Sequence, residues 1–292
     1  MGKKERLQKL GIIGLGILLI VTLVAGCGQQ QGEQVTKPTV KIGYINWQED
    51  VAVTYLWQEI LKEKGYNVEL TNVDAAPLFV GLSKGDLDLF LDSWLPITQQ
   101  AYWDKYKDKL DDYGAWYQGE AKVGLVVPKY VSINSIDELN EQKSKFGGQI
   151  IGIDPGAGIM KTTDKAIKDY GLNYELSQGS EAAMLATLDK AYKANQWLVV
   201  TGWSPHWMFS KYELKYLTDP KQAYGVAEGL HILANKEFTK KQSAIASALK
   251  KFKLNDQQIG SLEGLISQGL APQDAAKKWV EDNKDLVTSW MK

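Results

Sequence analysis

Three tryptophans each follow a short apolar run that is typical of a β-strand. They are Trp47 after residues 40–46, Trp94 after residues 87–93, and Trp203 after residues 197–202. In an α/β protein the carboxyl ends of the strands face the ligand crevice, so we expect the three indoles to meet there. A box of aromatic faces suits a methylated ammonium cation, because the rings attract the charge and the cation has no N–H groups to satisfy. The structural alternative is that the same rings are core residues.

A second candidate site lies in residues 152–160, Gly-Ile-Asp-Pro-Gly-Ala-Gly-Ile-Met, where a predicted strand turns into a predicted helix. Helix N-termini present free N–H groups and the positive end of the helix dipole. We therefore expect the backbone N–H groups of Gly158 and Ile159 to bind a carboxylate. A cation box combined with an anion site describes a zwitterionic ligand without net charge.

The apolar periodicity predicts strands and helices that alternate along the chain. Strands are expected at 40–46, 68–73, 87–91, 122–128, 150–154, 174–177, 198–201 and 231–235, and helices at 51–64, 77–84, 159–170, 180–194 and over most of the last fifty residues. Ser135, three residues before Glu138, predicts a helix N-cap, and Pro272 fits the first turn of a helix.

Two such strand–helix cycles indicate an α/β fold with two doubly wound lobes joined by two crossing strands. We expect residues 39–126 plus 226–292 to form lobe I and residues 127–225 to form lobe II. A cleft between lobes is a usual place for a small ligand. A guest that contacts rings from both lobes would draw them together, so that binding and closure become one event.

The first 26 residues have the features of a bacterial lipoprotein signal peptide. Basic residues precede an uncharged run over residues 10–25. Gly26 and the only cysteine, Cys27, follow this run directly. This pattern predicts cleavage before Cys27, lipidation of its thiol and a flexible tether over residues 27–38. A transmembrane anchor is the alternative, because the run is near the lower limit for a membrane span.

Charge and composition exclude several classes of protein. The chain carries a net charge of −1, and residues 1–26 hold four basic and one acidic side chain, so the remainder carries −4. A mildly acidic surface argues against nucleic acid as a partner. The two histidines, His206 and His231, come without a cluster of further ligands at metal-binding spacing. We therefore expect neither a metal site nor another cofactor.

Residues 81–85 satisfy the Gly-x-Ser-x-Gly pattern of serine hydrolases. That pattern requires a strand followed by a helix, whereas here a predicted helix precedes a predicted strand. The expectation is therefore a binding protein and not an enzyme. A secreted α/β hydrolase that uses Ser83 or His206 remains the alternative.

Four motifs resemble those of glycine betaine-binding lipoproteins, the substrate-binding subunits of osmoprotectant ABC importers. They are Ile45-Asn46-Trp47, Ser93-Trp94-Leu95-Pro96, residues 152–160, and residues 200–209 (Val-Thr-Gly-Trp-Ser-Pro-His-Trp-Met-Phe). The resemblance extends over about residues 40–290. It implies a bilobal periplasmic-binding-protein-like fold of type II, a cation cage of Trp47, Trp94 and Trp203, and a carboxylate held by Gly158 and Ile159.

The resemblance also implies the partners and the location. The protein would capture a betaine outside the cytoplasm, at the membrane of a Gram-positive bacterium, and deliver it to an ABC permease and its ATPase. Its lipid anchor would hold it at the membrane, and we expect it to be a monomer. Carnitine, choline or another amino-acid-like solute is the alternative ligand.

One position departs from the pattern of this family. Some relatives carry a histidine five residues after the tryptophan of the Trp-Leu-Pro motif, where it helps to bind the carboxylate, and this chain has Gln99 there. An amide can donate one hydrogen bond but brings no charge, so the preferred betaine could differ, for example carnitine or proline betaine. Gln99 and His206 are further candidates for ligand contact, although His206 could simply bond locally. We expect Trp57, Trp103, Trp116, Trp197, Trp207, Trp279 and Trp290 to be packing residues.

Overall fold

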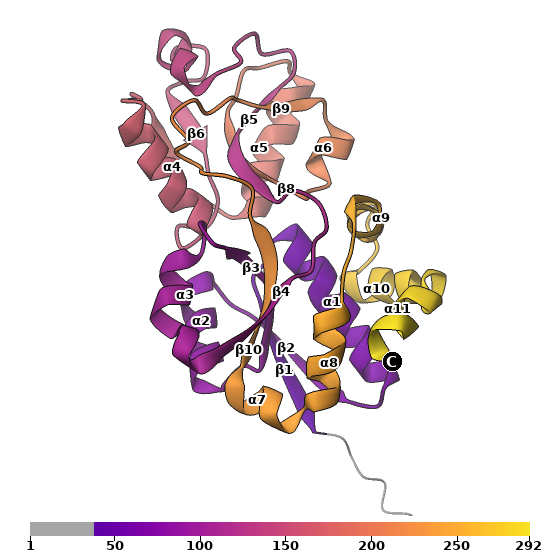
Figure 1. Cartoon of the computed structure of the whole chain (residues 1–292). Coiled ribbons are helices and arrows are strands. Elements are labelled where there is room, and N and C mark those ends of the chain that lie inside the picture. Colours follow the sequence, from indigo (N-terminus) through magenta and orange to yellow (C-terminus); the bar gives the residue numbers. More distant parts are fainter. Residues whose placement is uncertain (1–37) are drawn as a thin grey trace, which may run out of the picture. The chain divides into compact units, whose positions relative to one another are not determined.

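The computed structural model describes residues 38–292, which form two five-stranded sheets with helices around them (Figure 1). The predicted signal peptide, the lipidation site Cys27 and residues 28–37 of the predicted tether lie outside the described residues. In the described part, no helix combines the length and the apolar character needed to cross a bilayer.

The first sheet has the strand order β2-β1-β3-β10-β4. Its strands are β1 (Thr39–Tyr44), β2 (Asn67–Asn72), β3 (Leu89–Leu95), β4 (Leu110–Ala115) and β10 (Gly229–Asn235). β2, β1 and β3 are parallel, whereas β10 runs antiparallel between β3 and β4. The helices α2 (Ala75–Lys84) and α3 (Gln100–Tyr106) lie on one side of this sheet, and α1 (Gln48–Glu63) and α8 (Ser243–Lys251) lie on the other (Figure 1).

The second sheet repeats this plan with the order β7-β6-β8-β5-β9. Its strands are β5 (Lys122–Pro128), β6 (Gln149–Ile151), β7 (Glu175–Ser177), β8 (Val200–Ser204) and β9 (Leu214–Tyr216). β6 is parallel to β7 and β8, and β5 is antiparallel to β8 and β9. The main helices of this part are α4 (Gly158–Asp169) and α5 (Glu181–Lys193).

The remaining helices are short or belong to the C-terminal part of the chain. They are η1 (Lys107–Lys109), η2 (Ile136–Glu138), η3 (Asn140–Gln142), α6 (Met208–Lys211), α7 (Lys236–Lys241), α9 (Asp256–Ser267), α10 (Pro272–Asp282) and α11 (Lys284–Met291). Pro272 opens α10, as predicted, because its missing N–H would have no intrahelical acceptor there. Ser135 and Glu138 form the predicted capping box, but the helix that follows is a single 3-10 turn.

The predicted bilobal α/β fold is confirmed, but neither sheet is wholly parallel. Each sheet is mixed, because β5 and β10 join their sheets antiparallel to their neighbours. β5 pairs only with strands of the second sheet, and β10 pairs only with strands of the first sheet. Neither of these strands is therefore shared between the two sheets. The predicted lobe boundaries at residues 126 and 226 stay a prediction.

Aromatic residues hold the C-terminal helices against the first sheet. Phe252, just after α8, packs edge-on against Trp57 of α1 with 5.4 Å between ring centroids. Trp290 of α11 packs edge-on against Phe252 at 4.9 Å and lies parallel to Trp279 of α10 at 6.4 Å. These tryptophans are core residues, as expected, and Trp116 joins them against Phe252.

Besides Glu181 and Glu228, four carboxyl groups are buried in the described part of the chain. They belong to Glu49 and Asp50 in the first turn of α1, Asp92 in β3 and Glu263 in α9. Asp50 has a structural role, because its Oδ2 accepts a hydrogen bond of 2.7 Å from the backbone N–H of Ile45 and its Oδ1 accepts one from Thr54. Burial, together with the charges of Glu181 and Asp92, raises the pKa of Glu263 to about 8.

The pKa of Glu263 makes stability depend on pH. A carboxyl whose pKa is raised from 4.5 to about 8 on folding stabilises the native state most below pH 4.5, and the effect is lost as pH rises through 8. Glu263→Gln imitates the protonated form and removes this dependence. We therefore compare the free energy of unfolding of the variant with that of the wild type at each pH. The difference, variant minus wild type, should be larger at pH 8.5 than at pH 5 by on the order of 1–3 kcal/mol. Urea unfolding at the two pH values measures this, and an equal difference at both would contradict the assignment.

Candidate binding site

The three tryptophans singled out from the sequence line one cavity. Trp47 is the N-cap of α1, Trp94 lies in β3 and Trp203 lies in β8, so two of them lie inside the ends of strands and not just past them. Their exposed fractions are 5%, 3% and 3%. Gly158 and Ile159 line the same cavity, in which the space between atoms, open solvent included, amounts to ≈ 270 Å³. The other lining residues are Glu49, Thr98, Val123, Ile153 and Ala157.

Each indole N–H of the three tryptophans donates to a carboxylate. Trp94 Nε1 donates to Asp92 Oδ2 within β3 at 3.2 Å. We call the first sheet with its helices the first α/β unit, and the second sheet with its helices the second. The other two bonds run between these two α/β units: Trp47 Nε1 donates to Asp154 Oδ2 at 3.2 Å, and Trp203 Nε1 donates to Glu49 Oε2 at 2.8 Å.

These bonds use the polar edge of each ring and leave its faces available for a guest. A buried indole N–H usually finds such a partner, and here the partner is negatively charged when ionised. The three carboxyl groups therefore fix the orientation of the rings and, when ionised, place negative charge around the cavity. Such an arrangement attracts a cation.

The N-terminus of α4 provides the opposite polarity. α4 starts at Gly158, and its N-cap residue Ala157 has no side chain that accepts from the helix. The N–H groups of Gly158 and Ile159 belong to the first turn, where no intrahelical acceptor exists, and both residues are buried. A carboxylate docked there would be stabilised by these donors and by the helix dipole.

A loop from the first sheet covers this helix N-terminus. The backbone N–H groups of Ile97 and Thr98 each donate to Glu228 Oε2 at 2.8 Å, and Thr98 Oγ1 also donates to Glu228. The carbonyl group of Thr98 thereby lies against Gly158, with no room for a side chain between them. The residue at position 158 must therefore be glycine for the two segments to approach this closely.

Gln99 is fully buried beside Trp94 but does not line the cavity. Its Oε1 accepts a hydrogen bond of 3.2 Å from the backbone N–H of Trp94. Its Nε2 has no hydrogen-bond partner within residues 38–292. An unsatisfied buried donor costs about 1–3 kcal/mol, so an acceptor brought by a ligand or by water would be stabilised there.

His206 supports the cavity from outside and does not line it. Its Nδ1 accepts a bond of 2.9 Å from the backbone N–H of Met208, so the ring proton resides on Nε2, which donates to Glu181 Oε1 at 3.1 Å. The ring packs edge-on against Trp203, with 4.9 Å between centroids. Both ring nitrogens are thus used within the protein, and the imidazole holds Trp203 in place.

Several residues around the cavity were not predicted as site residues from the sequence, among them Glu49, Thr98 and Asp154. An acidic residue in the first turn of a helix is common because it suits the helix dipole, so Glu49 gives no distinct signal. Its position two residues after Trp47 is the one feature that could have drawn attention to it. Trp207, expected to be a packing residue, is half-buried and does not line the cavity.

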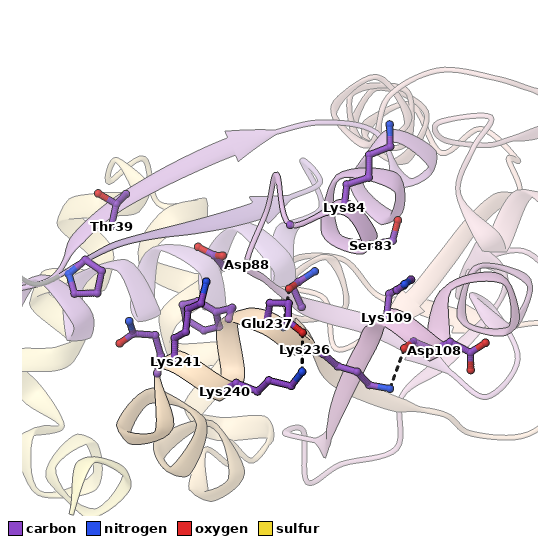
Figure 2. A pocket seen from close by; sticks show the side chains of 15 residues that line it. Thr39, Ser83, Lys84, Asp88, Asp108, Lys109, Lys236, Glu237, Lys240 and Lys241 are labelled. Carbon is purple, nitrogen blue, oxygen red and sulfur yellow. Dashed lines mark hydrogen bonds and ion pairs between the residues drawn. The ribbon is translucent and has the colours of Figure 1, made fainter.

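A larger hollow of ≈ 1300 Å³ lies elsewhere, beside the start of β1 and α7 (Figure 2). Its charged side chains are of mixed sign and partly satisfy one another. Lys240 pairs with Glu237 at 2.7 Å, and Lys236 Nζ donates to the carbonyl oxygen of Asp108 at 3.1 Å. Size alone therefore does not mark this hollow as the ligand site.

The same hollow contains Ser83, the residue of the hydrolase alternative. Ser83 lies in α2, and its Oγ donates to the carbonyl oxygen of Val80 at 2.8 Å. No histidine lines the hollow, so a nucleophile–base pair is not formed there. Within the described part of the chain, no group of three or more His, Cys, Asp or Glu side chains is placed to hold a metal ion.

Residues 38–282 match a protein family that is described as the substrate binding domain of ABC-type glycine betaine transport system. The chain belongs to this family. It is therefore a solute-binding domain of the ABC transporter type, and the resemblance seen in its motifs is confirmed.

Solved structures of similar proteins agree with this assignment. The lactococcal OpuAC in its closed-liganded conformation with glycine betaine has a TM-score of 0.83 and 36% identity, over 88% of this chain and 100% of that one. The glycine betaine, L-proline transporter protein ProX from Borrelia burgdorferi has the same score and identity, over 87% and 97% of the two chains.

A curated relative is similar over a shorter stretch. The glycine betaine/carnitine transport binding protein GbuC of Listeria monocytogenes serotype 1/2a (strain 10403S) is 44% identical over 157 residues. This stretch covers 51% of the present chain and 52% of that relative, so the chain matches about half of the length of GbuC.

Gly158→Ala tests the close approach of the two segments. The added methyl group would overlap the carbonyl oxygen of Thr98, so the α4 N-terminus and the loop before α3 would have to separate. We expect affinity for a zwitterionic ligand to fall at least about tenfold, since 1.4 kcal/mol is a factor of ten, with little change in melting temperature. Calorimetric titration and thermal unfolding measure the two effects. The control Gly156→Ala adds its methyl group in open space and should bind like the wild type.

Proposed function

We propose that this protein captures glycine betaine, or a closely related betaine, outside the cytoplasmic membrane and delivers it to an ABC importer for osmoprotection. The observation that carries the proposal is the shared cavity of Trp47, Trp94, Trp203, Gly158 and Ile159. Three aromatic walls, and a helix N-terminus whose N–H groups have no intrahelical acceptor, fit a trimethylammonium group at one end of a ligand and a carboxylate at the other.

The energetics of the cage support a small betaine. Each contact between an indole face and a desolvated cation is worth about 1–2 kcal/mol, so three contribute roughly 3–6 kcal/mol before the entropy of fixing the ligand is subtracted. A quaternary ammonium suits such walls because it donates no hydrogen bonds that the rings would leave unsatisfied. A primary ammonium, as in glycine, would bring three N–H donors to walls that are mostly aromatic and would leave most of them without partners.

Closure of the cleft would accompany binding in this proposal. Trp47 and Trp94 belong to the first α/β unit, and Trp203 and Gly158 to the second, so a guest in the cavity would contact both. The bonds Trp47–Asp154 and Trp203–Glu49 join the same two units. Ligand contacts and these bonds would therefore stabilise one closed state together.

Carnitine is the second candidate ligand. It shares the trimethylammonium and carboxylate groups with glycine betaine and adds a hydroxyl group. The relative GbuC, which is 44% identical over 157 residues, is a glycine betaine/carnitine transport binding protein, and this similarity supports carnitine as a candidate. Choline lacks a carboxylate and would leave the N–H groups of Gly158 and Ile159 unused.

The membrane attachment in this proposal rests on the N-terminal sequence. Cys27 would carry the lipid, and residues 28–37 would leave the folded body free to reach a permease and its ATPase. The body would act as a monomer at the outer face of the membrane of a Gram-positive cell. No cofactor takes part.

Trp203→Ala tests the cage. The substitution removes one ring face and the donor to Glu49, so we expect the affinity for glycine betaine to fall by at least about tenfold. Titration calorimetry with glycine betaine, proline betaine, carnitine and choline measures this and ranks the ligands. Trp197→Ala is a matched control, because Trp197 packs on Phe146 and does not line the cavity. Unchanged affinity of Trp203→Ala, or no binding of any quaternary ammonium by the wild type, would refute the proposal.

Cys27→Ser tests the lipid anchor. Without the thiol no thioether to a lipid can form, so the protein should be released from membranes or remain unprocessed. Fractionation of cells and mass analysis of the N-terminus measure both outcomes. Normal membrane attachment of the variant, with normal processing, would show that another segment provides the anchor.

A further inference from the structure

We propose that Glu49 is the anionic wall of the cation box: it supplies the counter-charge for the ammonium group and holds Trp203 across the cleft. The inference rests on the proposed function, because it concerns the same cavity. It adds a fourth, charged component to a cage otherwise built from three aromatic rings.

Position distinguishes Glu49 from the other carboxylates around the cage. Asp92 and Asp154 bond to the indoles of Trp94 and Trp47, but neither lines the cavity. Glu49 lines it and is only 1% exposed. Of the three carboxylates that hold the rings, Glu49 is thus the one that a bound ligand would touch.

The same side chain links the two α/β units. Glu49 lies in the first turn of α1, and its Oε2 accepts the indole N–H of Trp203 in β8 at 2.8 Å. The bond is charge-assisted when Glu49 is ionised and is therefore stronger in that state. A cation that favours the ionised form would accordingly strengthen the contact that holds Trp203 over the cavity.

Glu49 lacks a cationic partner of its own. Among the described residues no ion pair with a lysine includes Glu49, and the groups that face it are acidic or neutral. They are Asp92 from β3, Glu181 from α5 and Trp203 from β8, with Asp50 next to it on α1. His206, bonded to Glu181, is neutral in the arrangement described above. A buried carboxylate without a counter-charge is costly, and a quaternary ammonium in the cavity would provide one.

Proton binding provides an independent readout of this role. Burial, followed by the charges of Asp92 and Glu181, raises the pKa of Glu49 well above its usual value, and burial raises the pKa of Asp92 to about 7. The two buried carboxyls carry like charges when ionised, and this repulsion favours a bound proton on one of them when no cation is present. A cation favours the ionised form, so ligand binding near neutral pH should release protons into the buffer.

Charge selectivity is the functional consequence. Glycine betaine and 3,3-dimethylbutanoate have nearly the same shape, but the second carries a neutral tert-butyl group in place of the trimethylammonium group. The aromatic faces accommodate both shapes, whereas an anionic wall attracts only the cation. Glu49 should therefore account for a large part of the preference for the betaine over its carbon isostere.

Glu49→Gln tests the proposal because glutamine keeps the size of the side chain and an oxygen acceptor for Trp203, and removes the charge. We expect its affinity for glycine betaine to fall at least about tenfold, while competition by 3,3-dimethylbutanoate changes by less than about threefold. Titration calorimetry at pH 7 in two buffers of different ionisation enthalpy should show proton release by the wild type and little or none by the variant. Glu263→Gln is the matched control, since it neutralises another buried carboxyl that does not line the cage.

The outcomes separate this inference from the proposed function. If the wild type binds no quaternary ammonium compound, the proposed function fails and Glu49 has no ligand to attract. If the wild type binds glycine betaine but Glu49→Gln binds it within twofold of the wild type, Glu49 is not the anionic wall. The wild-type measurement needs no variant: betaine binding that releases no protons between pH 6.5 and 7.5 would also overturn the inference.

Discussion

The proposed site must offset the cost of taking a positive charge out of water. Indole faces offset part of that cost only if they are held in place before the ligand arrives, because reorienting them would consume the gain. In this protein each of the three indoles is fixed through its N–H by a carboxylate, namely Asp154, Asp92 or Glu49. When they are ionised, the same three groups place negative charge behind and beside the rings, so rigidity and electrostatic attraction have a common origin.

That constraint also explains why the site is divided between two α/β units. Rings that surround a cation on several sides leave no path for it to enter unless one wall can move away. Two of the indole–carboxylate bonds join the two α/β units. In one of them Trp47 of the first unit donates to Asp154 of the second, and in the other Trp203 of the second unit donates to Glu49 of the first. Glu228 holds the loop of Thr98 against Gly158 in the same region. The parts that would enclose the ligand are thus the parts that hold the cleft closed.

The sequence predicted the scaffold and the apolar part of the site better than its charged part. Alternation of strands and helices predicted which chain segments end at the cleft, and therefore where the tryptophans meet. It missed β4 and β9, because a half-buried edge strand such as Leu110–Ala115 and a strand of three residues show no clear periodicity. It also missed Glu49, since an acidic residue in the first turn of a helix is common for reasons unrelated to ligands. The contacts of a carboxylate depend on the tertiary structure, and the apolar periodicity of the sequence gives no information about those contacts.

The polarity of the cavity favours a zwitterion over either single ion. Carboxyl groups surround the aromatic end, and the N-terminus of α4 presents positive partial charge at the end formed by Gly158 and Ile159. A ligand with only a cation would satisfy the first end and leave the helix donors unpaired, and a ligand with only an anion would do the reverse. A neutral Gln99 is consistent with this balance, because the helix N-terminus already provides a site for one negative charge.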